Sequence, residues 1–302
     1  MSIRFAPAVM SLFGLSLAWR TVPDLAGWSG PWDGLMSIGA VLIGLIILGS
    51  MTVHLASRGV LMQVLNDPQL KVLPACLTVS LMLLSALLAP HMPELARILI
   101  WTASIAHFVL LIWLINGWFR GSNSLEAVSP VWFIPVVGNV VIPVGAMATN
   151  EVMLAWFGFS VGISLWLMLS PVVFLRLVHG KPMATEQEAS QIILIAPPAI
   201  GSVSWSLIGA EMGPLPGIIL MSVAFFLLLA LLPLIWRIFS RSFVPANWAF
   251  GFPLAALSTC LAIHGVLLDR EILMIASVSI LLFVTVIVGW LLLGSARILV
   301  KT

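Results

Sequence analysis

The chain has 302 residues, of which 61% are hydrophobic and only 8% are charged, and its formal net charge is +2. Soluble domains carry about 25% charged residues, because Lys, Arg, Asp and Glu are the side chains that normally face water. These counts exclude a soluble enzyme, a nucleic-acid-binding protein and a disordered chain. They leave a helical protein that crosses a membrane many times.

Apolar stretches follow one another along the chain, separated by charges, prolines, glycines and polar clusters. Because a bilayer core about 30 Å thick needs roughly 20 apolar residues per helix, we predict ten transmembrane helices. The predicted spans are residues 5–20, 34–57, 72–89, 95–119, 128–148, 152–178, 189–210, 214–239, 246–265 and 271–297. The short loops between them predict five antiparallel hairpins within a single transmembrane domain, residues 1–302.

The basic residues are distributed unequally between the two sides of the predicted spans. With ten spans both termini lie on one side, and that side holds ten of the thirteen basic residues: Arg4, Arg58, Lys71, Arg120, Arg176, Lys181, Arg237, Arg241, Arg297 and Lys301. The other side holds Arg20, Arg97 and Arg270. Such an excess marks the cytoplasmic side of a membrane protein, so we predict that both termini are cytoplasmic.

Each odd-numbered span carries a proline within its apolar run, and these prolines recur every 55 to 67 residues: Pro7, Pro74, Pro135, Pro198 and Pro253. A proline removes a backbone donor and kinks a helix, and the carbonyl that it frees has no partner in lipid. We therefore predict that the five odd-numbered helices form an inner ring around a pore, inside an outer ring of the five even-numbered helices. The alternative is that the prolines have no common role, because proline is frequent in membrane helices.

Three segments carry a resemblance to a known family. They are residues 15–19 (LSLAW), 196–199 (APPA) and 247–254 (NWAFGFPL), the last of which is similar to a Trp-Ala-x-x-Phe segment of the family. Together with the five proline-bearing hairpins, they resemble the tellurite-resistance/dicarboxylate transporter family. That family includes bacterial TehA proteins, fungal malate and sulfite transporters and the slow-type anion channels of plant guard cells.

The resemblance implies both a function and an assembly. It implies an anion pathway through each chain, a homotrimer, and a location in the bacterial inner membrane. It also implies that Phe252, by its place in the 247–254 segment, is a phenylalanine that plugs the pore midway. We therefore expect small inorganic or organic anions and membrane lipid as partners.

The predicted spans contain no charged residue near their centres, which favours passive conduction over tight binding of an anion. Selectivity then depends on weaker groups. Hydroxyls in the odd-numbered helices are candidate hydrogen-bond donors to a passing anion: Ser202, Ser204, Ser258 and Thr259. Basic residues at the cytoplasmic mouth would raise the local anion concentration: Arg58, Arg120, Arg176 and Arg241.

One alternative function stays open on the same fold. A secondary transporter, proton-linked or uniport, would carry C4-dicarboxylates, sulfite or tellurite oxyanions. His107, in the fourth predicted span, is the one clear intramembrane ionisable group, and it fits either a proton relay or a hydrogen bond between helices. No pattern of clustered His, Asp or Glu predicts a membrane enzyme, a metal site or a cofactor site, and we expect none of these.

Overall fold

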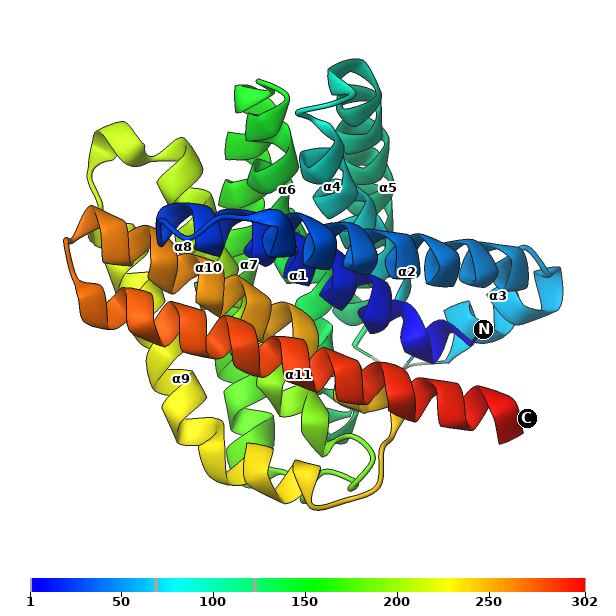
Figure 1. Cartoon of the computed structure of the whole chain (residues 1–302). Helices are drawn as coiled ribbons and strands as arrows, with labels where there is room; N and C mark the ends of the chain where they lie inside the picture. The colour runs from blue at the N-terminus through cyan, green and yellow to red at the C-terminus, as the bar shows by residue number, and fades with distance from the viewer. Residues whose placement is uncertain (1, 68–69, 122–123, 302) are drawn as a thin grey trace.

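The computed structural model describes residues 2–67, 70–121 and 124–301, and this part of the chain is helical between its turns and loops (Figure 1). For Arg58 and residues 299–301 the structure describes the backbone but not the side chains. The α-helices are α1 (Ala6–Leu25), α2 (Pro31–Leu55), α3 (Arg58–Asn66), α4 (Pro74–Leu88), α5 (Pro93–Phe119), α6 (Phe133–Ala148), α7 (Val152–His179), α8 (Ala196–Ile208), α9 (Leu215–Phe239), α10 (Gly251–Leu267) and α11 (Glu271–Lys301).

Nine helical segments of the described chain are long and apolar enough to cross a membrane. The third predicted span, residues 72–89, is shorter than we predicted: α4 has 15 residues, because it begins only at Pro74 after turns at residues 71–73. Sequence reasoning also missed α3, which lies in a stretch that we took for a loop. Only nine residues long, α3 is too short to produce a clear apolar pattern.

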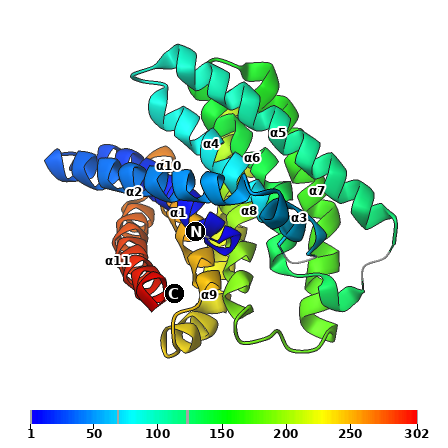
Figure 2. The ribbon, with the colours of Figure 1, turned by 90° about the vertical axis from the view of Figure 1, so that its right-hand side faces the viewer.

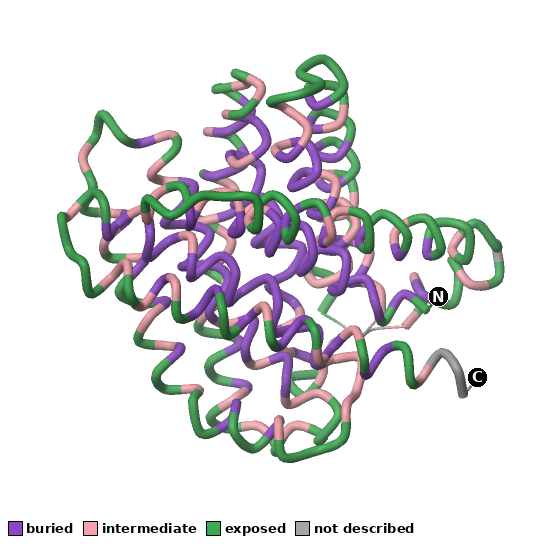
Figure 3. Tube along the Cα trace, viewed as in Figure 1, coloured by how far each residue is buried: buried purple, intermediate pink, exposed green. Residues whose placement is uncertain are grey.

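The spans fall into two classes by burial (Figure 3). In the segments that contain α1, α6, α8 and α10, between 67% and 83% of the most apolar window is buried inside the protein. In those that contain α2, α5, α7, α9 and α11, the buried share is between 17% and 33%. The short α4 belongs with the first class, since most of its side chains are buried. The mostly buried class consists of the odd-numbered predicted spans, and the mostly exposed class consists of the even-numbered ones.

Contacts between helices follow the hairpin order. Each buried helix packs against the exposed transmembrane helix that comes next in the sequence. These pairs are α1–α2, α4–α5, α6–α7, α8–α9 and α10–α11. The buried helices also pack against one another, α1 on α4, α4 on α6, α6 on α8, α8 on α10, and α10 on α1. Figure 2 shows the pairs α1–α2 and α10–α11 on one side of the molecule and α4–α5 and α6–α7 on the other. Both termini lie at the same end (Figure 1).

The five prolines do not lie in the interior of the α-helices. They are the first, second or third residues of α4, α1, α6, α8 and α10. Four of these helices are preceded directly by a 3₁₀ segment: Ile3–Phe5, Pro130–Trp132, Glu188–Ile195 and Pro245–Phe250. The first N–H groups of an α-helix lack an intrahelical acceptor, so a proline there breaks no α-helical bond. Each proline therefore marks the place where the α-helical part of a buried segment begins.

Glycines allow the closest helix contacts. In α7, Gly158 and Gly162 are four residues apart and face α6, where a Cβ atom on Gly162 would lie 2.5 Å from Val140 Cγ2 and 2.8 Å from its backbone nitrogen. A Cβ on Gly158 would lie 2.7 Å from Ile142 Cβ. Small residues at this spacing let two membrane helices approach each other at their backbones. This contact fixes α6, one wall of the site described next.

Candidate ion pathway

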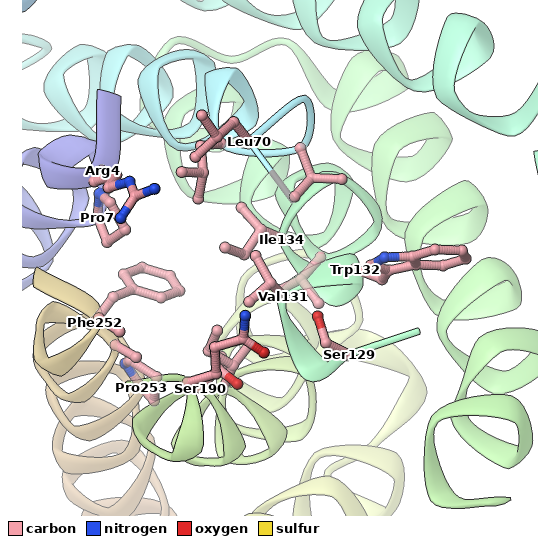
Figure 4. A pocket seen from close by; sticks show the side chains of 18 of the residues that line it. Arg4, Pro7, Leu70, Ser129, Val131, Trp132, Ile134, Ser190, Phe252 and Pro253 are labelled. Atoms are coloured by element: carbon pink, nitrogen blue, oxygen red, sulfur yellow. The ribbon is translucent and has the colours of Figure 1, made fainter. Parts of the chain in front are cut away.

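A cavity of about 300 Å³ lies among the N-terminal ends of the five buried helices (Figure 4). All five contribute to it, either directly or through the residue that precedes them. The lining includes Pro7 and Met10 of α1, Leu73 and Val79 at α4, Ile134 and Val141 of α6, Ala196 of α8, and Phe252 and Pro253 of α10. Residues from the segments between hairpins also line it, among them Leu70, Val128, Met183 and Val244. The loops that we predicted to be cytoplasmic therefore surround this cavity.

The ring of Phe252 projects from α10 into this cavity, toward the side formed by Val131 and Ile134 (Figure 4). The residue is only 3% exposed. Behind the ring lies Gly14 of α1, where a Cβ atom would be 2.9 Å from Phe252 Cδ2. Among the described residues of α10, Pro253 is the last that lines the cavity. The ring consequently stands at the inner limit of the cavity on the α10 side.

The segment before Phe252 is anchored on both sides. Ser11 of α1 donates a hydrogen bond to the carbonyl of Trp248 at 3.1 Å, and the Trp248 indole N–H donates to Ser295 Oγ of α11 at 3.0 Å. Gly251 sits against Ser11, and a Cβ atom on Gly251 would collide with the Ser11 side chain. These contacts fix the start of α10, and with it the direction in which the Phe252 ring points.

Charged side chains of both signs line the cavity. Arg4 is exposed at its rim, whereas Arg176 is only 7% exposed. Arg176 lies in the last turn of α7 and donates from Nη1 to the carbonyl oxygen of Lys181 at 2.8 Å. The acidic residues Glu126 and Glu186 are exposed and also line the cavity. The formal charges of these four side chains sum to zero. An anion would therefore be attracted by single positively charged groups and not by the net charge of the lining.

The sequence profile of a family described as "SLAC1: Voltage-dependent anion channel" matches residues 1–298. The chain belongs to the SLAC1 family. It is also similar to two S-type anion channels of Arabidopsis thaliana. SLAH1 is 27% identical over 222 residues, which are 69% of this chain and 56% of SLAH1. SLAH4 is 24% identical over 212 residues, which are 66% of this chain and 57% of SLAH4.

These matches bear on the sequence-based expectations. The resemblance to the group that contains slow-type anion channels is confirmed at the level of the SLAC1 family, which is described as a channel family and not as an enzyme family. The matches extend over little more than half the length of the two S-type anion channels. They leave the predicted TehA-like identity untested.

Four arginines were predicted at the mouth of the pathway in this SLAC1-family chain. Of the three whose side chains the structure describes, Arg176 alone lines the cavity. Arg241 instead forms an ion pair with Glu188 at 2.8 Å. Arg120 lies beside a separate pocket of about 160 Å³ together with Lys71. The side chain of Arg58 lies outside the described residues. Sequence reasoning placed Arg4 on the side predicted to be cytoplasmic but did not place it at the mouth, although its spacing of three residues from Pro7 puts both on one helix face.

The hydroxyls predicted to line the pore engage other helices or their own. Ser202 of α8 donates to the carbonyl oxygen of Gly217 in α9 at 2.7 Å, and Ser204 donates to that of Val140 in α6 at 2.5 Å. A hydroxyl has a single proton, so neither group has a donor left for an anion in this conformation. Neither serine is among the residues that line the cavity in the described chain.

The two hydroxyls of α10 behave in the same way. Ser258 donates to the carbonyl oxygen of Ser277 in α11 at 2.8 Å, and Ser277 donates to that of Ser258 at 2.7 Å. Thr259 donates to the Ala255 carbonyl of its own helix at 3.1 Å. Neither Ser258 nor Thr259 is among the described residues that line the cavity. Contact of these hydroxyls with a passing anion stays a prediction.

His107 links three helices. Its Nε2 lies 2.8 Å from the carbonyl oxygen of Pro135 in α6, and its Nδ1 lies 2.6 Å from Thr78 Oγ1 in α4. Because the carbonyl can only accept, Nε2 carries a proton. The Thr78 hydroxyl, the partner of Nδ1, also lies 2.9 Å from the carbonyl oxygen of Ala75 in its own helix. The His107 side chain is completely buried. This geometry favours the structural hydrogen bond over the proton relay for this residue.

Proposed function

We propose that this chain is an anion channel that encloses its own ion pathway, with Phe252 as the gate. The observation that carries the proposal is the Phe252 ring in a cavity lined by all five buried helices. A hydrophobic ring in a narrow passage excludes a hydrated ion by sterics and by dewetting. An aromatic gate does not bind the anion, so the pathway conducts as soon as the ring moves aside.

The five buried helices form the proposed inner ring around the pathway, and the five exposed helices form the outer ring. In support, α1, α4, α6, α8 and α10 contact one another in a closed order, and each carries its own exposed partner. All five α-helical parts begin at the cavity. The positive ends of their dipoles therefore favour a negative ion there, although each contributes only a fraction of a charge.

The test is the current carried by Phe252→Ala in planar bilayers. We expect the variant to pass chloride, nitrate, sulfite and malate at a rate well above wild type, with reversal potentials that follow the anion gradient. Phe250→Ala is the matched control, because Phe250 is also fully buried but packs against Phe239 and does not line the cavity. If Phe252→Ala conducts no better than wild type at equal protein density, the gate is elsewhere.

The same preparation separates a channel from the alternative coupled transporter. A channel passes anions along the electrochemical gradient alone, whereas a proton-linked carrier for C4-dicarboxylates, sulfite or tellurite saturates and responds to an imposed pH gradient. No charged residue lies near the middle of a described span, which supports the channel. Flux driven by a pH gradient at zero membrane potential would instead establish the carrier.

We further propose a homotrimer in a bacterial inner membrane with both termini in the cytoplasm. The orientation is supported by the excess of basic residues in the loops around the cavity and by the position of both termini at one end (Figure 1). Native mass spectrometry in detergent measures the oligomeric state. The orientation is measured with the variant Ser2→Cys. A membrane-impermeant thiol reagent is applied to intact cells and to inverted vesicles, and labelling in the vesicles alone indicates a cytoplasmic N-terminus.

A further inference from the structure

Arg176 is a buried cation without a counterion. Its side chain lies at the cavity, yet no carboxylate oxygen approaches it within 4.0 Å in the described part of the chain. Only Nη1 has a hydrogen-bond partner, the Lys181 carbonyl at 2.8 Å, and Nε is buried without one. Burying a charge without pairing it is unfavourable, so such a group normally has a partner.

The end of α7 holds this side chain in place. The Gly180 N–H donates to the Arg176 carbonyl at 3.0 Å and ends the helix there. A Cβ atom on Gly180 would lie 2.9 Å from Arg176 Cδ and would collide with Nη1. The missing side chain of Gly180 is therefore what lets Arg176 fold back over the helix end. With Nη1 engaged by Lys181, the edge of the guanidinium formed by Nε and Nη2 has no partner among the described residues.

A second polar group in the cavity is also buried without a hydrogen-bond partner. Ser190, in the 3₁₀ segment before α8, is 4% exposed and lines the cavity (Figure 4). Its Oγ has no hydrogen-bond partner in the part of the chain that the structure describes. Two buried donors without acceptors in one cavity, one of them charged, indicate a site for an acceptor that the chain itself does not supply.

We propose that Arg176 and Ser190 form an oxyanion-binding subsite in this cavity, on the cytoplasmic side of Phe252, and that it selects planar monovalent oxyanions such as carboxylates. The subsite rests on the proposed channel function. The free Nε–Nη2 edge presents two parallel N–H groups, a geometry that matches two oxygens of a planar oxyanion and offers no such match to a spherical chloride ion. The exposed Glu126 and Glu186 also line the cavity, and their negative charges reduce the attraction for an anion, so the subsite holds one anion weakly enough to release it.

The test uses formate and chloride, which are both small and monovalent, in the Phe252→Ala background. We expect Arg176→Lys to keep the charge but to lower the formate-to-chloride permeability ratio, measured from reversal potentials, by about threefold to tenfold, because one of two charge-assisted hydrogen bonds is lost. Ser190→Ala should lower the ratio in the same direction. Arg241→Lys is the control, since Arg241 is paired with Glu188 and does not line the cavity. An unchanged ratio in Arg176→Lys and Ser190→Ala overturns the proposal.

A binding measurement keeps this result separate from the channel proposal. Formate at tens of millimolar should raise the melting temperature of the wild-type protein more than chloride does, and this difference should disappear in Arg176→Lys. A formate-specific shift without any current in Phe252→Ala would retain the subsite and reject the gate. Current without a formate-specific shift, together with an unchanged permeability ratio, would retain the gate and reject the subsite.

Discussion

Gly14 of α1 and Phe252 of α10 are packed directly against each other. A Cβ atom at position 14 would lie 2.9 Å from Phe252 Cδ2 and 3.6 Å from Cε2, closer than side chains tolerate without movement. The backbone of α1 therefore forms the wall behind the proposed gate, and only glycine leaves room for the ring in its observed position. Because a phenyl ring moves more readily than the α1 backbone, the ring must give way when this wall is thickened.

We predict that Gly14→Ala displaces the Phe252 ring and changes the closed-state current. The result is a current between those of wild type and Phe252→Ala if the ring moves out of the passage, and a smaller one if it moves further in. In either case the effect should vanish in the Phe252→Ala background, since the two residues are in contact. Gly39→Ala is the control, because a Cβ atom at Gly39 meets no atom within 4 Å. Equal currents in Gly14→Ala and wild type would contradict the contact.

The sequence predicts the two classes of helices well, because burial follows local composition. Pro7, Pro135, Pro198 and Pro253 identify the buried segments, and charges between the spans identify the loops. The hydrogen-bond partners of individual polar groups were not predictable. Ser204 and Ser258 could face a pore or a neighbouring helix, and the choice depends on rotation about the helix axis, which no local pattern fixes.

The same limit applies to the arginines. Arg176 lies in the last turn of α7 and Arg241 lies just after α9, both on the side predicted to be cytoplasmic. Arg176 lines the cavity, whereas Arg241 forms an ion pair with Glu188. The difference arises from a residue 53 positions away in the chain and from the missing side chain at Gly180. Long-range pairing of this kind can be seen only in the fold, whereas the sequence alone predicts a side of the membrane for each arginine.

We predict that Ser258→Ala lowers stability without altering anion selectivity. Ser258 and Ser277 each donate to the carbonyl of the other, which ties α10 to α11, and removal of one of these buried hydrogen bonds costs about 1 kcal/mol. The melting temperature in detergent measures the first effect, and the chloride-to-nitrate permeability ratio in the Phe252→Ala background measures the second. A changed ratio with an unchanged melting temperature would return Ser258 to the ion pathway.

The glycine contact between α6 and α7 gives a third prediction. In Gly162→Ala the new methyl group would meet Val140 at both its side chain and its backbone nitrogen, so α7 must move away from α6. Overpacking of this kind costs about 1–3 kcal/mol. We expect a lower melting temperature than in Gly289→Ala, where a Cβ atom meets no atom within 4 Å. Comparable melting temperatures for the two variants would show that the α6–α7 contact is less tight than these distances indicate.

Arg4 and Arg120 differ in position although both lie on the side predicted to be cytoplasmic, and this difference gives the last prediction. Arg4 lines the cavity, whereas Arg120 lies at the end of α5 beside a different pocket. In the Phe252→Ala background, Arg4→Gln should lower the anion current that enters from this side, because it removes positive potential at the mouth. Arg4 is exposed, so the loss should be clear at about 0.01 M salt and should largely disappear near 1 M, where the Debye length falls to about 3 Å. Arg120→Gln should leave the current unchanged at both concentrations. Equal losses in the two variants would mean that the mouth responds to the overall charge of this side and not to the residues at the cavity.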